Sequence, residues 1–394
     1  MISKRFEDIS KCDIDALVAN SVPEGRTIDY KRSLPGATDD DKREFLADVS
    51  SFANAAGGDL VYGVREDKGV PASAVGLAGI DPDAEILRLD NSIRNGIDPR
   101  VPGVQIKAVS GFPDGPAIVL RVPSSWSSPH MVTFKNLSRF YSRTNAGKFQ
   151  MDVMEIRTGF LLSEAIPERM ARFRDDRLSK IIADETPLPM LEGGAVVLHL
   201  LPVSAFSQPV TIDVAAVARE RMPPIYSTNS TSGWDGRLNL DGLVTYRMDA
   251  DNECLSYLQV FRRGILEAVE KITLASLTPS DPKVIRPEYE VKLVEVLPEY
   301  LGLLRDLGLL PPVFIFLTLL GAKGYTMDVP RRQFEKSTAI DRDTLFLPEV
   351  VVDAFDAFPA TAVMKPVFDI VWQAAGLARS RNYDQAGNWK PRRD

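Results

Sequence analysis

The Gly57–Gly58 pair constrains the fold most strongly, because it separates a helix pattern from a strand pattern. Upstream of it, apolar residues recur at the spacing of one helical face: Phe45, Leu46, Val49, Phe52 and Ala53. Three aspartates at 39–41 suit the N-terminus of this helix. Downstream, residues 59–64 are typical of an apolar strand, and two glycines permit a tight turn between the two elements. Together with a strand at 27–31, this pattern predicts a strand–helix–strand unit.

The rest of the chain continues the alternation of helices and strands. A helix is predicted over about 83–96, strands near 104–110, 116–122 and 137–143, and a charged helix from Met151 to Phe173. From Gly193 the pattern restarts, and 394 residues exceed what one core normally spans. The predicted fold class is α/β (α+β). We expect a mixed-sheet domain over 1–158, a helical linker over 159–192, a second α/β domain over 193–380 and a loose polar tail over 381–394.

The scarcity of cysteine and histidine limits the possible chemistry. Two cysteines and two histidines cannot build a disulfide framework or a zinc cluster, so any catalytic metal is expected to be Mg²⁺ or Mn²⁺ on carboxylates. No apolar run reaches the roughly 18 residues that cross a bilayer, and the N-terminus lacks the apolar segment of a signal peptide. We therefore expect a cytoplasmic protein with no membrane partner.

Charge is unevenly distributed along the chain. The net charge is −7, which disfavours broad nonspecific binding to nucleic acid, yet no acid occurs between Asp114 and Asp152. That interval carries five basic residues: Arg121, Lys135, Arg139, Arg143 and Lys148. Within it, basic side chains alternate with aromatic ones, an arrangement that suits contacts with an RNA backbone and stacking on bases.

The candidate nucleic-acid contacts are Arg139, Tyr141, Arg143, Lys135, Lys148 and His130. Two simpler interpretations stay open. Phe140 would lie in the core while Arg139, Tyr141 and Arg143 are merely exposed. His130, which follows Pro129, would be a hydrogen-bonded turn histidine rather than a phosphate contact.

A second group of candidates lies on the strand at 27–31. Strand alternation places Asp29 and Lys31 on one face, and Glu24 precedes them on the entering loop. A carboxylate beside an ammonium suits metal-assisted phosphodiester chemistry, in which the lysine neutralises charge on the phosphate. Glu66 or Asp67, in the turn expected after the second strand, would supply a third acid. Taken alone, the Asp-x-Lys pattern also fits an ordinary surface ion pair.

The order of these parts resembles the Schlafen AlbA domain. That family has an acid, a strand with acid-x-Lys, a helix ending in S-F-A-N-x-x-G-G, and a strand ending in Gly-Val followed by acids. The corresponding parts here are Glu24, Ile28–Lys31, Ser51–Gly58 and Gly63–Asp67, followed later by Ser128–His130 and Arg139–Arg143. The resemblance covers about residues 15–158.

The resemblance implies a metal-dependent endoribonuclease that acts on structured RNA such as tRNA, with a role as a toxin or phage-defence effector. Carried over by position, the catalytic residues are Glu24, Asp29, Lys31 and Glu66 or Asp67, and the Mg²⁺ or Mn²⁺ ligands are Glu24, Asp29 and Asp67. Asp29 is one methylene shorter than the glutamate usual at its position. Because vertebrate relatives pair two such lobes, the resemblance also implies a homodimer.

Two other functions fit the sequence. The first is a non-catalytic regulator that binds a nucleotide, such as ATP, or nucleic acid in the same groove without cutting; Asp29 and the acidic net charge favour it. Bacterial relatives often carry an ATP-binding label, although the chain has no G-x-x-x-x-G-K-[ST] phosphate loop. The second is a subunit of a larger defence assembly that acts only with a partner.

Overall fold

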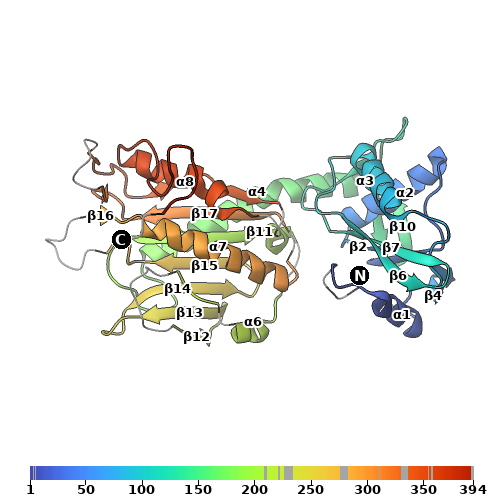
Figure 1. The fold of residues 1–394 in the computed structure, drawn as a ribbon, viewed down its shortest axis with the longest axis horizontal. Helices are drawn as coiled ribbons and strands as arrows, with labels where there is room; N and C mark the ends of the chain where they lie inside the picture. The colour runs from blue at the N-terminus through green and yellow to red at the C-terminus, as the bar shows by residue number, and fades with distance from the viewer. Residues whose placement is uncertain are drawn as a thin grey trace. The chain divides into compact units, whose positions relative to one another are not determined.

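The computed structural model divides the chain into two compact units, Met1–Ile166 and Pro167–Asp394. It describes all residues except 3, 5, 208–210, 221, 226–233, 276–282, 310, 330–335, 354, 356–357 and 392–394. Both units combine helices with sheets, which confirms the predicted α/β class (Figure 1). No described helix is both long enough and apolar enough to span a membrane.

A four-stranded mixed sheet forms the centre of the first unit. Its order is β1 (Ile28–Lys31), β2 (Gly58–Tyr62), β7 (Gly115–Val122) and β6 (Gln105–Phe112). β1 and β2 are parallel, and the other neighbours are antiparallel. Helices α2 (Asp39–Ala53) and α3 (Pro82–Gly96) share a core with one face of this sheet, whereas α1 (Lys11–Ala19) packs on the other face.

Smaller sheets flank this centre. One contains β10 (Gly147–Gln150), β9 (Arg139–Thr144), β8 (Met131–Val132) and β5 (Ile97–Asp98), and a hairpin joins β3 (Val64–Asp67) to β4 (Val70–Ala74). The turn predicted at 65–69 is therefore mostly strand, because the chain reverses only at Lys68 and Gly69, both of which have positive φ. β9 packs directly on α2, so residues about 90 positions apart share one site.

Gly57 and Gly58 have the role expected of them at the end of α2. Gly57 has a φ of +71°, a conformation that L side chains rarely adopt. A Cβ on Gly58 would lie 2.2 Å from a Phe52 ring carbon and 2.7 Å from the Thr27 carbonyl oxygen. Glycine at these positions lets α2 turn directly into β2 and pack closely against the strand that carries Asp29.

The second unit is built on one large antiparallel sheet. Its path is β12 (Asp235–Leu238), β13 (Gly242–Met248), β14 (Cys254–Phe261), β15 (Leu266–Glu270), β11 (Ala195–Pro202), β17 (Val313–Leu320) and β19 (Leu345–Phe346), with β20 (Val350–Val352) also on β17. Helices α6 (Val214–Glu220), α7 (Glu288–Asp306) and α8 (Ala360–Ala374) pack on one face, and the end of α4 (Val153–Ile182) packs on the other. The short elements are α5 (Ser204–Ser207), β16 (Val284–Ile285) and β18 (Thr326–Met327).

The tail that the sequence predicts to be loose is packed where the structure describes it. Asn382 of this tail is buried and donates a hydrogen bond of 2.8 Å to Glu290 on α7, and Ser380, just before the tail, donates one of 2.6 Å to the same carboxylate. The Trp372 indole of α8 donates to the same carboxylate at 2.7 Å, and Tyr383 is buried beside α8. The polar composition predicts a loose segment, but the hydrogen bonds to the buried Glu290 carboxylate hold the polar residues at its start in place.

Candidate functional site

Asp29 is the centre of a buried charged cluster on the α2 face of the first sheet. Strand alternation directs Ile28 and Tyr30 into the α1 core and Asp29 and Lys31 to the opposite face, as predicted. Asp29 is only 3% exposed, and its two oxygens accept hydrogen bonds from different cations. Lys31 Nζ donates to Oδ1 at 2.7 Å, and Arg143 of β9 donates to Oδ2.

The two cations determine the charge state of Asp29. Burial by itself would raise the pKa of this carboxyl group, but Arg143 and Lys31 together hold it below its usual value. Asp29 is therefore ionised at neutral pH. The Asp29 side chain fixes both cations in place and has no oxygen without a hydrogen bond.

Arg143 is buried, whereas a side chain that contacts RNA has to be exposed. It is 6% exposed, and its guanidinium carbon lies 4.1 Å from the centre of the Phe52 ring. Only Nη2 is bonded; within the described part of the chain, Nε and Nη1 have no hydrogen-bond acceptor. The simpler interpretation, in which Arg143 is merely exposed, is therefore wrong.

Glu24 lies beside Asp29 and is half-buried. Its Oε1 accepts a hydrogen bond of 2.8 Å from the Tyr30 amide, which orients the side chain toward β1. Burial and then the negative charge of Asp29 raise the pKa of Glu24 to about 7, although the Tyr30 amide and Lys31 oppose this shift. Near neutral pH, Glu24 is therefore able to give or take a proton.

Glu66 and Asp67 lie on β3 and are exposed. Glu66 Oε2 accepts a hydrogen bond of 2.6 Å from the Gly69 amide, and the Gly69 carbonyl accepts one of 2.6 Å from the Glu24 amide. A Cβ on Gly69 would also lie 3.6 Å from Glu24 Oε2. The hairpin turn thus brings Glu66 toward Glu24 through the turn residue Gly69.

The arrangement does not fit the metal site expected from the sequence. Among the described residues, no three acidic, histidine or cysteine side chains are grouped so that they could hold a metal ion. Both oxygens of Asp29 are bonded to cations, and Glu66 is bonded to its own turn. A divalent ion at Asp29 would have to displace a buried guanidinium, which is electrostatically costly.

The predicted basic stretch does not form a free basic surface, because four of its five cations pair with acids from elsewhere in the chain and the fifth, Arg139, bonds a neutral side chain of the stretch itself. Lys135 bonds Asp39 at 2.7 Å, and Arg139 bonds the Gln150 amide oxygen at 2.6 Å. Lys148 bonds Asp48 of α2 at 2.8 Å and also contacts Glu44. Arg121 forms a buried two-pronged pair with Asp59 at 2.7 and 3.0 Å.

His130 and Tyr141 contribute mainly to packing. His130 is fully buried, and its Nδ1 lies 2.6 Å from the Pro99 carbonyl oxygen. Burial lowers the pKa of His130, so the ring is neutral at neutral pH. Tyr141 is half-buried against the α2–α3 core. We exclude His130 from the candidate ligand contacts, and the geometry agrees with a hydrogen-bonded structural histidine.

The first unit thus has a strand, a helix and a glycine turn in that order, a charged cluster on β1, and β9 packed on α2. The Schlafen AlbA_2 family model matches residues 24–152. These residues are a Schlafen AlbA_2 domain. The match confirms the resemblance inferred from the sequence, and this domain family indicates a function related to nucleic acid.

The other comparisons add little. No curated protein matches the chain. Matching solved structures include the crystal structure of the DIP2311 protein from Corynebacterium diphtheriae, with 19% identity and a TM-score of 0.25. That match covers 35% of this chain and 26% of the other, so the chain spans about a quarter of that protein's length.

The S-F-A-N segment of the AlbA_2 domain connects α2 to the two strands that follow the cis Ser128–Pro129 bond. The Asn54 amide donates to the carbonyls of His130 and Tyr141, at 2.9 and 2.8 Å, and accepts from the His130 amide at 2.6 Å. Ser50 donates to the same His130 carbonyl at 3.0 Å. These bonds hold β9 against α2 and thereby place Arg143 over Asp29.

Asp48 is the residue of this cluster that sequence reasoning missed. It is 3% exposed, and burial raises its pKa although Lys148 and Lys31 oppose the shift. The sequence contains a signal for it, because Asp48 lies three residues after Phe45 and four before Phe52, on the buried stripe of the helix. An acid on such a stripe needs a cationic partner.

Proposed function

We propose that the AlbA_2 domain binds structured RNA and that Lys31 contacts the phosphate backbone. The observation that carries the proposal is the position of Lys31, a partly exposed cation bonded to the buried Asp29, which also holds the buried Arg143. Its side chain is 37% exposed, whereas Asp29 and Arg143 are each 4% exposed. Phosphate contacts dominate the affinity of proteins for nucleic acids, and a cation already held in place loses little entropy on binding.

The surroundings keep Lys31 charged. Burial lowers the pKa of an ammonium group, but the carboxylates of Asp48, Asp29 and Glu24 outweigh burial and raise the pKa of Lys31. Lys31 is thus a permanent positive charge near neutral pH. The choice of structured RNA rests on the family to which the domain belongs.

We expect Lys31→Gln to weaken binding of bulk tRNA about tenfold near 0.1 M salt and to reduce the slope of log K against log salt by about 0.9, because one phosphate contact is lost. Fluorescence anisotropy over a salt series measures both quantities. Lys11→Gln is the matched control, because Lys11 is a surface lysine paired with Asp15 on α1. Equal affinity and slope for the Lys31 variant and wild type would refute the proposal.

The second candidate function is cleavage of the bound RNA, as in Schlafen-type endoribonucleases. The observation in its favour is that Glu24 lies beside Asp29 at β1, while the backbone of the β3–β4 turn, which Glu66 bonds, contacts Glu24 through Gly69. Glu24 is the member suited to transfer a proton near neutral pH. Among the described residues, the carboxylates as arranged do not fit a Mg²⁺ or Mn²⁺ ion.

Glu66→Gln is the sharpest test of cleavage. Glu66 is exposed, and glutamine retains the oxygen that accepts from the Gly69 amide, so stability should not change. If the chain cleaves tRNA, we expect the variant to lose at least tenfold in rate, with Mn²⁺ or with EDTA present, while the exposed Glu7→Gln control keeps full activity. Intact tRNA after incubation of wild type under both conditions would reject this function and leave RNA binding as the role of the domain.

The homodimer and the role in defence are further proposals. Light scattering coupled to size-exclusion chromatography measures the mass of the particle and distinguishes a dimer from a single 43.5 kDa chain. RNA binding through Lys31 does not depend on the outcome, because Glu24, Asp29, Lys31 and Arg143 all belong to one copy of the first unit.

A further inference from the structure

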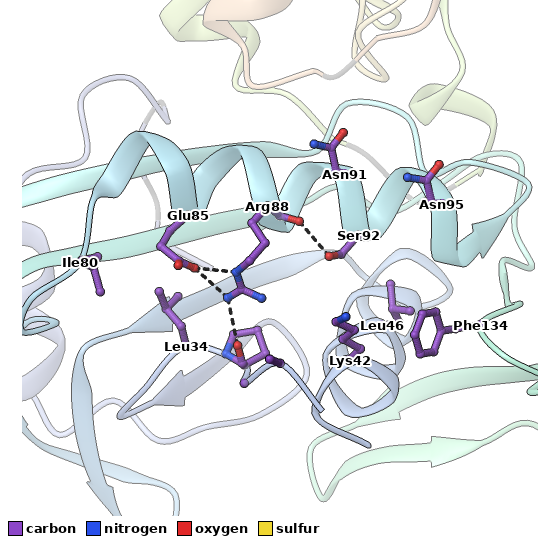
Figure 2. A pocket seen from close by; sticks show the side chains of 13 residues that line it. Leu34, Lys42, Leu46, Ile80, Glu85, Arg88, Asn91, Ser92, Asn95 and Phe134 are labelled. Atoms are coloured by element: carbon purple, nitrogen blue, oxygen red, sulfur yellow. Dashed lines mark hydrogen bonds and ion pairs between the residues drawn. The ribbon is translucent and has the colours of Figure 1, made fainter. Parts of the chain in front are cut away.

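Three cations of the AlbA_2 domain that are unpaired among the described residues, Arg32, Lys42 and Arg65, lie around two adjoining pockets outside the basic stretch 115–151. The first pocket, about 750 Å³, lies between α2, α3 and the loop after β1, and Lys42 lines it (Figure 2). The second, about 290 Å³, is lined by Arg32 and Arg65. Leu34 and Ile80 line both pockets, so the two spaces meet at these side chains. We call the pair the Arg32 groove.

The charge of the Arg32 groove is positive and partly uncompensated. Within the part of the chain that the structure describes, the side chains of Arg32, Lys42 and Arg65 make no hydrogen bond or ion pair. Two acids also line the groove: Asp114, and Glu85, which is bonded to Arg88. Four cations thus face two acids, and three of the cations have donors available for an anionic ligand.

The two pockets differ in chemistry. The larger has an apolar wall of Leu34, Leu46, Ile80 and Phe134; in Figure 2, Leu46 and Phe134 lie beside Lys42, and Leu34 lies on the side of Ile80. The smaller has the two unpaired arginines, whose planar guanidinium groups suit phosphate oxygens. A ligand that spans the groove would therefore have a flat apolar part and a phosphate close to it.

The wall of the larger pocket is fixed in place. Arg88 Nε donates to Glu85 at 2.8 Å, and its Nη2 donates to the Pro35 carbonyl at 2.9 Å, which ties α3 to the loop after β1 (Figure 2). Thr38 caps α2 on the other side, where its hydroxyl accepts from the Asp41 amide at 3.2 Å. The volume is also within the range of small-molecule sites, roughly 300–1,000 Å³.

We propose that the Arg32 groove binds a nucleoside phosphate unit, with the base against Leu34, Leu46 and Phe134 and the phosphate on Arg32 and Arg65. The inference rests on the proposed RNA-binding function and adds to it a site that lies apart from Asp29. A nucleoside phosphate unit of this kind occurs in two ligands, a free nucleotide and one nucleotide of an RNA strand.

The test compares two double variants with equal loss of charge, Arg32→Gln/Arg65→Gln and Arg100→Gln/Arg157→Gln. The control arginines are also exposed and unpaired among the described residues, but they do not line the groove. ATP binding is measured by calorimetry, and binding of a short unstructured RNA by anisotropy. We expect the groove variant to lose at least tenfold in affinity. For RNA, its slope of log K against log salt should fall by roughly 1.4, and the control should change little.

The outcomes separate these two ligands. If the groove variant loses affinity for RNA alone, the groove is a subsite for an RNA strand; if for ATP alone, it is a site for a free nucleotide. Lower affinity for both supports recognition of the nucleoside phosphate unit that they share. Ala37→Trp, at an exposed position on the wall of the larger pocket, should weaken the same ligand without any change of charge. The proposal is overturned if wild type binds neither probe or if both double variants behave alike. RNA binding that depends on Lys31 but not on Arg32 and Arg65 would overturn the groove and leave the proposed function standing.

Discussion

Asp29→Asn should destabilise the AlbA_2 domain by about 3 kcal/mol, because Asp29 is the anion bonded to the buried Arg143 guanidinium, and among the described residues Arg143 has no other bonded partner. Asparagine has one oxygen for two cationic donors, and its amide group would face one of them. Hydrogen exchange of β1 and α2 peptides, followed by mass spectrometry, measures the loss of local stability. Peptides of the second unit provide the internal reference.

A double variant isolates the electrostatic cause. Asp29→Asn/Arg143→Met removes both buried charges and leaves an apolar side chain over Phe52, so we expect it to recover most of the lost stability. If the two single effects simply add, burial of the charge pair is not the reason for the loss. In either case, an Asp29 variant that fails to bind or cleave RNA is no evidence for a catalytic Asp29 until its fold has been measured.

The elements of both units were predictable because helix and strand periods are local properties of the chain. The stripe from Phe45 to Ala53 and the apolar run at 313–320 predict α2 and β17 within a few residues. Fold class and the AlbA_2 family follow from the same local patterns. The positions of Glu66 and Asp67 on β3 were missed, because the sequence gives no strand period between Gly63 and Gly69.

Charge pairing was not predictable, because it depends on contacts between distant segments. The acid-free interval from 115 to 151 predicts a basic surface, yet four of its five cations pair with Asp29, Asp39, Asp48 and Asp59. The partners come together only when β9 and β10 pack on α2, which depends on the hydrogen bonds of Asn54. Conversely, Arg32 and Arg65 lie in acid-rich sequence and remain unpaired among the described residues.

The second large effect is expected at Glu267 in the other unit, where Glu267→Ala should cost about 4 kcal/mol. Glu267 lies on β15, is fully buried, and accepts two hydrogen bonds of 2.8 Å from Arg177 of α4. Tyr257 donates to it at 2.8 Å, and His199 Nε2 lies 3.0 Å away. Without this carboxylate, the buried Arg177 guanidinium would lose the charged group to which it is bonded.

Urea unfolding followed by tryptophan fluorescence measures this loss, because three of the four tryptophans lie in the second unit. Burial alone would raise the pKa of Glu267, but its bonds to Arg177 and His199 lower the pKa to about 2, against an ordinary value of 4.5. Its contribution to stability is therefore complete above pH 4.5 and is lost as the pH falls toward 2. Glu267→Gln should lack this acid-dependent component, and an identical acid profile in wild type and variant would show that the buried carboxylate does not hold α4 on the sheet.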